Sequence, residues 1–110
     1  MLTRYFDKYR NRKTTIAGIK FDSKKEGLRY LELLQLQNNG KIQHLERQKK
    51  FDLFVTEQKI CSYIADFTYY KNSLKYVVED VKSAITKKLP VYKIKKNLMK
   101  AIYGIQIKEI

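Results

Sequence analysis

Apolar residues recur at helical spacing in the first third of the chain, at Leu28, Leu31 and Leu34. Ser23, followed three residues later by Glu26, is the pattern of a capping box at the start of a helix. Asn39 and Gly40 are residues that end a helix. The pattern therefore predicts a helix that begins after Ser23 and stops at Asn39.

The middle of the chain changes to a strand pattern. The segments with this pattern are residues 50–55, 59–70 and 75–82. The second is rich in aromatic and β-branched side chains, which favour strands. Residues 71–74 (KNSL) have turn composition, so the second and third strands are expected to form a hairpin.

The last part of the chain combines a second helix with a short strand. Its apolar stripe consists of Val91, Ile94, Leu98 and Ile102, with lysines around it. Pro90 suits the first helical turn, and Gly104 suits the end. Residues 105–110 alternate isoleucine with polar residues and predict a strand parallel to the third, because a helix connects the two.

The expected order is α, β, β, β, α, β, which predicts an α/β fold with a central mixed sheet flanked by helices. Residues 1–20 are expected to be a basic N-terminal arm, with a short strand or turn around Gly18, and residues 21–110 a single domain.

Charge narrows the range of partners. The 110 residues include 24 Lys and Arg against 11 Asp and Glu, a formal net charge of +13. An excess this large in a small domain indicates a polyanionic partner, and DNA is the expected one. A soluble protein that is merely basic is the simpler alternative. An acidic membrane surface is a third, but the chain has no Trp to anchor it.

Cysteine usage and hydropathy bear on location. Cys61 is alone, which excludes an intrachain disulfide and a cysteine metal cluster and favours a reducing cytosol. The first 13 residues have no apolar core of a signal peptide. No apolar run approaches the roughly 18 residues that a membrane span needs, so no membrane is expected.

Acidic residues inside apolar strands are the strongest candidates for chemistry. Asp80 and Lys82 share one face of their strand, and Glu79 points to the other. A hairpin centred near Ser73 puts Asp66 opposite Asp80, whereas a turn one residue tighter puts it opposite Glu79. In the first register two carboxylates face each other about 5 Å apart at Cβ, which destabilises a sheet unless a cation lies between them.

Oxygen ligands of this kind suit Mg²⁺ or Mn²⁺, and the carbonyl of Val81 would add another. Lys82 would orient a water molecule or neutralise developing negative charge. Two simpler readings stay open. Asp80 and Lys82 could form a plain ion pair, and Asp66 could face water at the end of its strand.

An acid followed by an (Asp/Glu)-x-Lys tripeptide across a hairpin, after a helix that carries a Glu, resembles the PD-(D/E)xK nuclease superfamily. The segments that carry the resemblance are NRKTTIAGIKFDSKKEGLRYLELL, LERQKKFDL, YIADFTYY and VVEDVKS. They also look like small phage endonucleases and phage Holliday-junction-resolvase-type nucleases, over about residues 11–110. Ala65 stands where the superfamily name has Pro.

The resemblance implies a restriction-endonuclease-like αβββαβ core, Mg²⁺-dependent DNA cleavage and a phage protein acting in the bacterial cytoplasm. Glu26, Asp66 and Asp80 match the metal-binding acids, and Lys82 matches the catalytic lysine. Gln48 lies where some relatives have a polar residue near the site. Glu26 has a competing role, since in a capping box its carboxylate turns back to the Ser23 amide.

The remaining residues give weaker indications. His44, the only histidine, is expected on the surface, with general-base chemistry as the alternative. Phosphate contacts are expected from Arg10, Arg12, Lys13, Lys93 and Lys95. A domain this small rarely encloses two DNA strands, so a homodimer is expected. A non-catalytic nucleic-acid-binding module, or an interaction protein of a phage replication or packaging complex, is the alternative to an enzyme.

Overall fold

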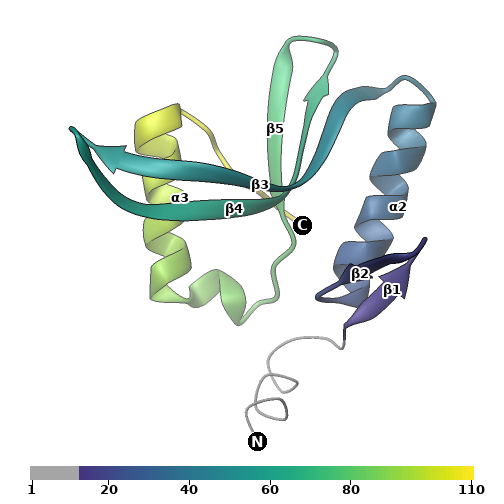
Figure 1. Ribbon diagram of the computed structural model, residues 1–110, viewed down its shortest axis with the longest axis horizontal. Helices are drawn as coiled ribbons and strands as arrows, with labels where there is room; N and C mark the ends of the chain where they lie inside the picture. Colours follow the sequence, from purple (N-terminus) through teal and green to yellow (C-terminus); the bar gives the residue numbers. More distant parts are fainter. Residues whose placement is uncertain (1–12) are drawn as a thin grey trace, which may run out of the picture.

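A computed structural model of the chain describes residues 13–110, and it has an α/β fold (Figure 1). Its strands are β1 (Thr14–Ile16), β2 (Ile19–Phe21), β3 (Ile42–Val55), β4 (Gln58–Lys71), β5 (Lys75–Asp80) and β6 (Lys108–Glu109). Its helices are α2 (Lys24–Asn38), α3 (Pro90–Tyr103) and the short 3₁₀ helix η1 (Thr86–Lys88). The predicted order of helices and strands from Phe21 onward is confirmed.

The main sheet has the strand order β3-β4-β5-β6. β3 to β5 are antiparallel, and β6 pairs parallel to β5, so the sheet is mixed as predicted. β3 begins at Ile42 rather than at residue 50, and β6 has only two residues where six were expected. The turn after β4 lies at Asn72 and Ser73, whose left-handed φ angles are 56° and 66°.

The sheet is divided into two wings that pack on different helices. Figure 1 shows the long β3–β4 ribbon crossing over α3, while β5 and the start of β3 lie toward α2. The core beside α3 consists of Phe51, Leu53, Tyr63, Ala65, Val78, Tyr92, Met99 and Ile107. The core beside α2 consists of Phe21, Leu33, Ile42, Phe67 and Tyr69.

Ala65 and Phe67 show where one wing becomes the other. They lie two residues apart on β4, and alternation would put them on one face, yet Ala65 packs in the α3-side core and Phe67 in the α2-side core. The twist of the ribbon therefore redirects this face at Asp66. On β3 the residue between the corresponding partners is Gln48, whose φ angle of 53° is left-handed.

The β1–β2 hairpin covers the start of α2. Ile16 and Ile19 of this hairpin pack against the α2-side core. The close approach depends on Gly27, because a Cβ there would meet Ile16 Cδ1 at 2.5 Å and Phe21 Cδ2 at 3.2 Å. The strand and turn expected around Gly18 are confirmed.

Both helices begin and end as predicted, but most of each predicted apolar stripe is exposed, although Leu98 packs against the α3-side core. On α2, Leu28 is 47% exposed and Leu31 39%, whereas Leu33 is buried. On α3, Val91 is 63% exposed and Ile94 57%, whereas Tyr92 and Met99 are buried. No helix in residues 13–110 combines the length and apolar character needed to cross a membrane.

Candidate functional site

The register of the β4–β5 hairpin brings two of the predicted acids together. Phe67 pairs with Glu79 and Thr68 with Val78, which is the register that puts Asp66 opposite Asp80. The alternative, with Asp66 opposite Glu79, is wrong. The paired ladder ends just before Asp66, at the point where the two wings of the sheet meet.

Asp66 and Asp80 are held by a backbone amide just after β5 and by a tyrosine hydroxyl on β4. The Val81 amide donates a hydrogen bond to Asp66 Oδ2 at 2.8 Å. Tyr63 Oη donates to Asp80 Oδ2 at 2.6 Å, and the side chain of Asp80 is 2% exposed. Val81 therefore reaches the site through its amide, and a role for its carbonyl as a metal ligand stays a prediction.

Lys82 lies beside Asp80, as the shared strand face predicts. Its Nζ is 3.2 Å from Asp80 Oδ2 and 4.5 Å from the centre of the Tyr92 ring. The side chain is 22% exposed, so the ammonium lies at the rim of the acid pair rather than in bulk water. Tyr92 is itself fixed by a hydrogen bond from its hydroxyl to Glu109 Oε2 at 2.6 Å.

Glu26 joins the site from the first turn of α2. Its backbone amide donates to Ser23 Oγ at 3.1 Å, which is one half of a capping box. Its carboxylate accepts from Gln48 Nε2 at 3.3 Å instead of turning back to the Ser23 amide. Gln48 Nε2 is also 3.5 Å from Asp66 Oδ1, so this side chain bridges two of the predicted acids.

Burial and mutual repulsion perturb these carboxyl groups. Burial first, and then the hydrogen bond and negative charge of Asp80, raise the pKa of Asp66 from 3.8 to about 8. Burial and the charge of Asp22 raise the pKa of Glu26, an effect that Arg47 partly offsets. Asp66 therefore holds a proton near neutral pH unless a bound cation takes the place of that proton.

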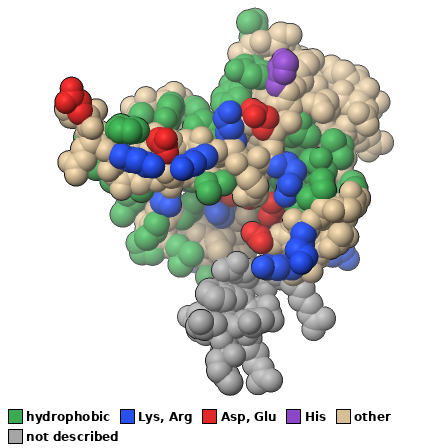
Figure 2. Space-filling model, viewed as in Figure 1, with side chains coloured by type: hydrophobic (Ala, Val, Ile, Leu, Met, Phe, Trp, Pro, Cys, Tyr) green, Lys and Arg blue, Asp and Glu red, His purple; other side chains and the backbone are tan. Residues whose placement is uncertain are grey.

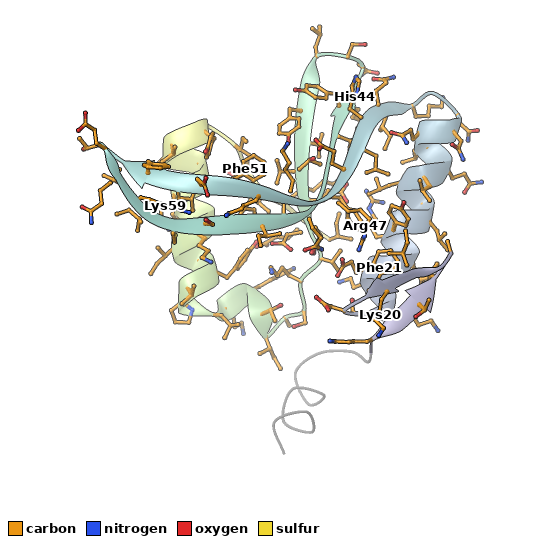
Figure 3. The ribbon with its side chains drawn as sticks, viewed as in Figure 1. Lys20, Phe21, His44, Arg47, Phe51 and Lys59 are labelled. Atoms are coloured by element: carbon orange, nitrogen blue, oxygen red, sulfur yellow. The ribbon has the colours of Figure 1, made fainter. Side chains whose placement is uncertain are left out.

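Arg47 is a nearby cation that is kept out of the acid cluster. Its guanidinium lies over Phe21, 4.5 Å from the ring centre, and 5.6 Å from the centre of the Tyr30 ring. Figure 3 shows it directed toward Phe21, beside the β1–β2 hairpin. These contacts hold its charge near Glu26 but leave it paired with aromatic rings.

Glu79 has a role that the sequence did not suggest. It is fully buried on the α2 side of β5, and it accepts two hydrogen bonds from Arg29 and one from Tyr69. The only feature of the sequence that bears on this contact is that Arg29 lies one helical turn after Glu26, on the same side of the helix. That spacing does not reveal a partner 50 residues away.

The donor set fits a hard divalent cation, because Glu26, Asp66 and Asp80 supply oxygen atoms alone. A cation would also relieve the repulsion that raises the pKa of Asp66. In the described residues, however, no three His, Cys, Asp or Glu side chains are already arranged to hold a metal ion. Figure 2 shows acidic side chains gathered below the middle of the β3–β4 ribbon, with Lys and Arg side chains near them.

The other predicted residues differ in exposure, and two of them lie outside the described chain. Lys13 and Lys93 are exposed, and Lys95 is half-buried on α3. Arg10 and Arg12 lie outside the described residues. His44 is exposed and lines a hollow of about 330 Å³ with Gln43, Tyr70 and Ser73, which none of the acids enters.

Comparison with known proteins adds a family to this geometry. The family described as "Protein of unknown function (DUF1064)" matches residues 6–109. The chain belongs to this family. No curated protein and no solved structure matches the chain. The family description assigns no activity, so function is argued from the site of this DUF1064 protein.

Proposed function

We propose that the protein is a metal-dependent DNA endonuclease that hydrolyses phosphodiester bonds, with branched phage DNA as a candidate substrate. The observation that supports this most is the pair Asp66 and Asp80, held side by side with Lys82 at the rim. Two opposed carboxylates are costly in a folded protein. Binding of Mg²⁺ or Mn²⁺ would offset their repulsion and account for their placement side by side.

In this proposal Glu26, Asp66 and Asp80 hold the ion. When bound, the ion polarises a phosphoryl oxygen and lowers the pKa of a coordinated water. Lys82 stabilises negative charge on the attacking or departing oxygen, since its Nζ is fixed by Asp80 and Tyr92. Gln48 keeps the Glu26 and Asp66 carboxylates oriented toward each other.

The net charge of +13 supports a DNA substrate. Phosphates would be contacted by the lysines and arginines, with Lys13, Lys93 and Lys95 among the candidates in the described chain. Because the sequence resembles phage nucleases, we propose that the protein acts in the bacterial cytoplasm.

The deciding experiment incubates the purified protein with Mg²⁺ or Mn²⁺ and linear, single-stranded and four-way-junction DNA. Wild-type protein should cut at least one substrate, and Asp66→Asn and Lys82→Ala should lower kcat by at least 100-fold while DNA binding persists. Asp52→Asn and Lys59→Ala are matched controls, because this ion pair lies on the β3–β4 ribbon and should not affect cleavage.

A non-catalytic nucleic-acid-binding module is the second candidate. Two findings favour it. Among residues 13–110, no cluster of three or more His, Cys, Asp or Glu side chains is already arranged to hold a metal ion. Asp80 is also already bonded to Tyr63 and Lys82. Binding to DNA without cutting in either metal would support it. Failure to bind any nucleic acid would leave an interaction protein as the remaining class.

We also propose that the protein acts as a homodimer. The stripe on α3 formed by Val91, Ile94 and Ile102 is 63%, 57% and 36% exposed, which is unusual for an amphipathic helix and suits a second copy of the chain. Light scattering should give twice the chain mass, and Ile94→Glu should halve it. Leu28→Glu, on the exposed side of α2, is the control and should leave the mass unchanged.

A further inference from the structure

Glu79 is a carboxylate that the proposed chemistry does not use, although it directly precedes Asp80. It is fully buried and faces α2. Arg29 Nε is 2.8 Å from its Oε1, and Arg29 Nη2 is 2.6 Å from its Oε2. This two-bond geometry fixes both the distance and the angle between the two groups.

The position of this pair in the chain is informative. Arg29 lies three residues after Glu26, so the two side chains are neighbours on one side of α2. Glu79 and Asp80 are consecutive on β5, and their side chains point to opposite faces. The Arg29–Glu79 pair therefore ties the helical turn that carries Glu26 to the strand position that carries Asp80.

Stability alone does not account for such a pair. Replacing a buried ion pair with apolar residues of similar volume is often neutral or stabilising. What apolar residues do not reproduce is the fixed geometry of a guanidinium and a carboxylate joined by two hydrogen bonds. Pairing also keeps each of the two charges from acting on the acid cluster. A free Arg29 would compete for Glu26, and an unpaired Glu79 would add a negative charge beside Asp80.

We propose that Arg29 and Glu79 are positioning residues that set the separation between Glu26 and Asp80 and keep the Arg29 charge out of the acid cluster. This inference rests on the proposed nuclease function for its kinetic consequences. Its structural consequence, a fixed distance between α2 and the end of β5, is independent of any activity.

The first test is the double variant Arg29→Met/Glu79→Leu, which removes both charges and leaves neither partner unpaired. We expect its melting temperature to stay close to that of Tyr69→Phe, since both variants lose the Tyr69–Glu79 hydrogen bond, while kcat falls on the order of 100-fold and the Mg²⁺ concentration for half-maximal rate rises. A pair that only stabilises the fold predicts the opposite, namely that kcat follows stability. Wild-type kcat and Mg²⁺ dependence in this variant would overturn the inference.

Single variants protect the test against misfolding of the double variant. Arg29→Lys keeps the charge but loses the two-bond geometry, and it should lower kcat roughly 10-fold in a folded protein. Glu79→Gln frees Arg29 and should raise the Mg²⁺ requirement further than Arg29→Lys does. Tyr69→Phe is the matched control, because Tyr69 also donates to Glu79 but lies on β4 and does not join the helix. Its kcat should stay within about twofold of the wild type, and an equal loss there would overturn the inference.

A distance measurement separates this inference from the nuclease proposal. Spin labels on Lys24→Cys and Ala84→Cys, both exposed positions, report the separation of α2 and the segment after β5 in a Cys61→Ser background. The Arg29–Glu79 pair predicts a narrow distribution that broadens in Arg29→Met/Glu79→Leu. If the wild type cuts no DNA and this change still occurs, the positioning role stands and the nuclease proposal fails. If the distribution is the same in both proteins, the positioning role fails.

Discussion

The most unusual feature at the scale of single residues is the raised pKa of Asp66. Its carboxyl group is expected to keep its proton in the folded protein up to about pH 8, whereas an unfolded aspartate ionises near 3.8. The folded state thus binds more protons than the unfolded state between these values. The contribution of Asp66 to stability is therefore fully present below about pH 4 and is lost as pH rises toward 8.

Asp66→Asn should remove this dependence, because asparagine can still accept from the Val81 amide but carries no ionisable group. We expect the variant to unfold at higher urea concentration than the wild type at pH 8, by on the order of 2–4 kcal/mol in the free energy of unfolding. Added Mg²⁺ should stabilise the wild type at pH 8 and leave the variant unchanged. Urea titrations at several pH values measure both effects. A stability difference between Asp66→Asn and the wild type that does not grow between pH 4 and 8 would contradict the assigned shift.

Part of the site was predictable at this scale. Strand alternation and turn length are local properties, and they limited the hairpin to two registers, of which the symmetric one around Ser73 is observed. The partner of Glu79 was not predictable, since the pairing with Arg29 is set by how α2 packs on the sheet. The contact of the Glu26 carboxylate with Gln48 was likewise not predictable, since Gln48 lies on another strand.

At the scale of elements, the β1–β2 hairpin and α2 depend on one another through Gly27. Gly27→Val should push the hairpin away and destabilise the protein by about 1–3 kcal/mol, since branched carbons would overlap Ile16 and Phe21. Leu28→Val places the same side chain at the next, exposed position and should cost far less. Thermal unfolding of the two variants compares them directly. Helix propensity alone favours Val over Gly, so a Gly27→Val variant as stable as the wild type would contradict the steric argument.

Helix ends were predicted well and helix faces poorly. Caps such as Ser23 and Gly104 act through neighbouring backbone groups, so sequence reveals them. Which stripe of a helix faces the core depends on how the helix packs on the sheet. Leu33 of α2 and Met99 of α3 are buried, whereas most of the more regular apolar stripe is exposed, apart from Leu98. The first half of β3 was missed for a related reason. Its many charged residues do not show a strand pattern, and the segment forms a strand because it pairs with β4.

At the scale of the whole molecule, the dominant property is charge. If the protein grips DNA through phosphates, the logarithm of the binding constant should fall linearly with the logarithm of salt concentration, with a slope of about −0.9 for each phosphate neutralised. Lys93→Ala and Lys95→Ala should each make the slope shallower by about 1 if they contact phosphates. Lys59→Ala, whose charge is paired with Asp52, should not. A binding constant independent of salt would remove DNA as the partner of the basic surface.

The left-handed backbone at Gln48 sets a limit on how this region can change. Asparagine or glycine would adopt a φ angle of 53° at lower cost than glutamine. Neither can extend an amide as far as Glu26 and Asp66, however, because the first is one carbon shorter and the second has no side chain. Replacing Gln48 to relieve the main chain would therefore leave the Glu26 and Asp66 carboxyl groups without this hydrogen-bond donor. The native glutamine keeps an unfavourable φ angle in exchange for a side chain long enough to contact both.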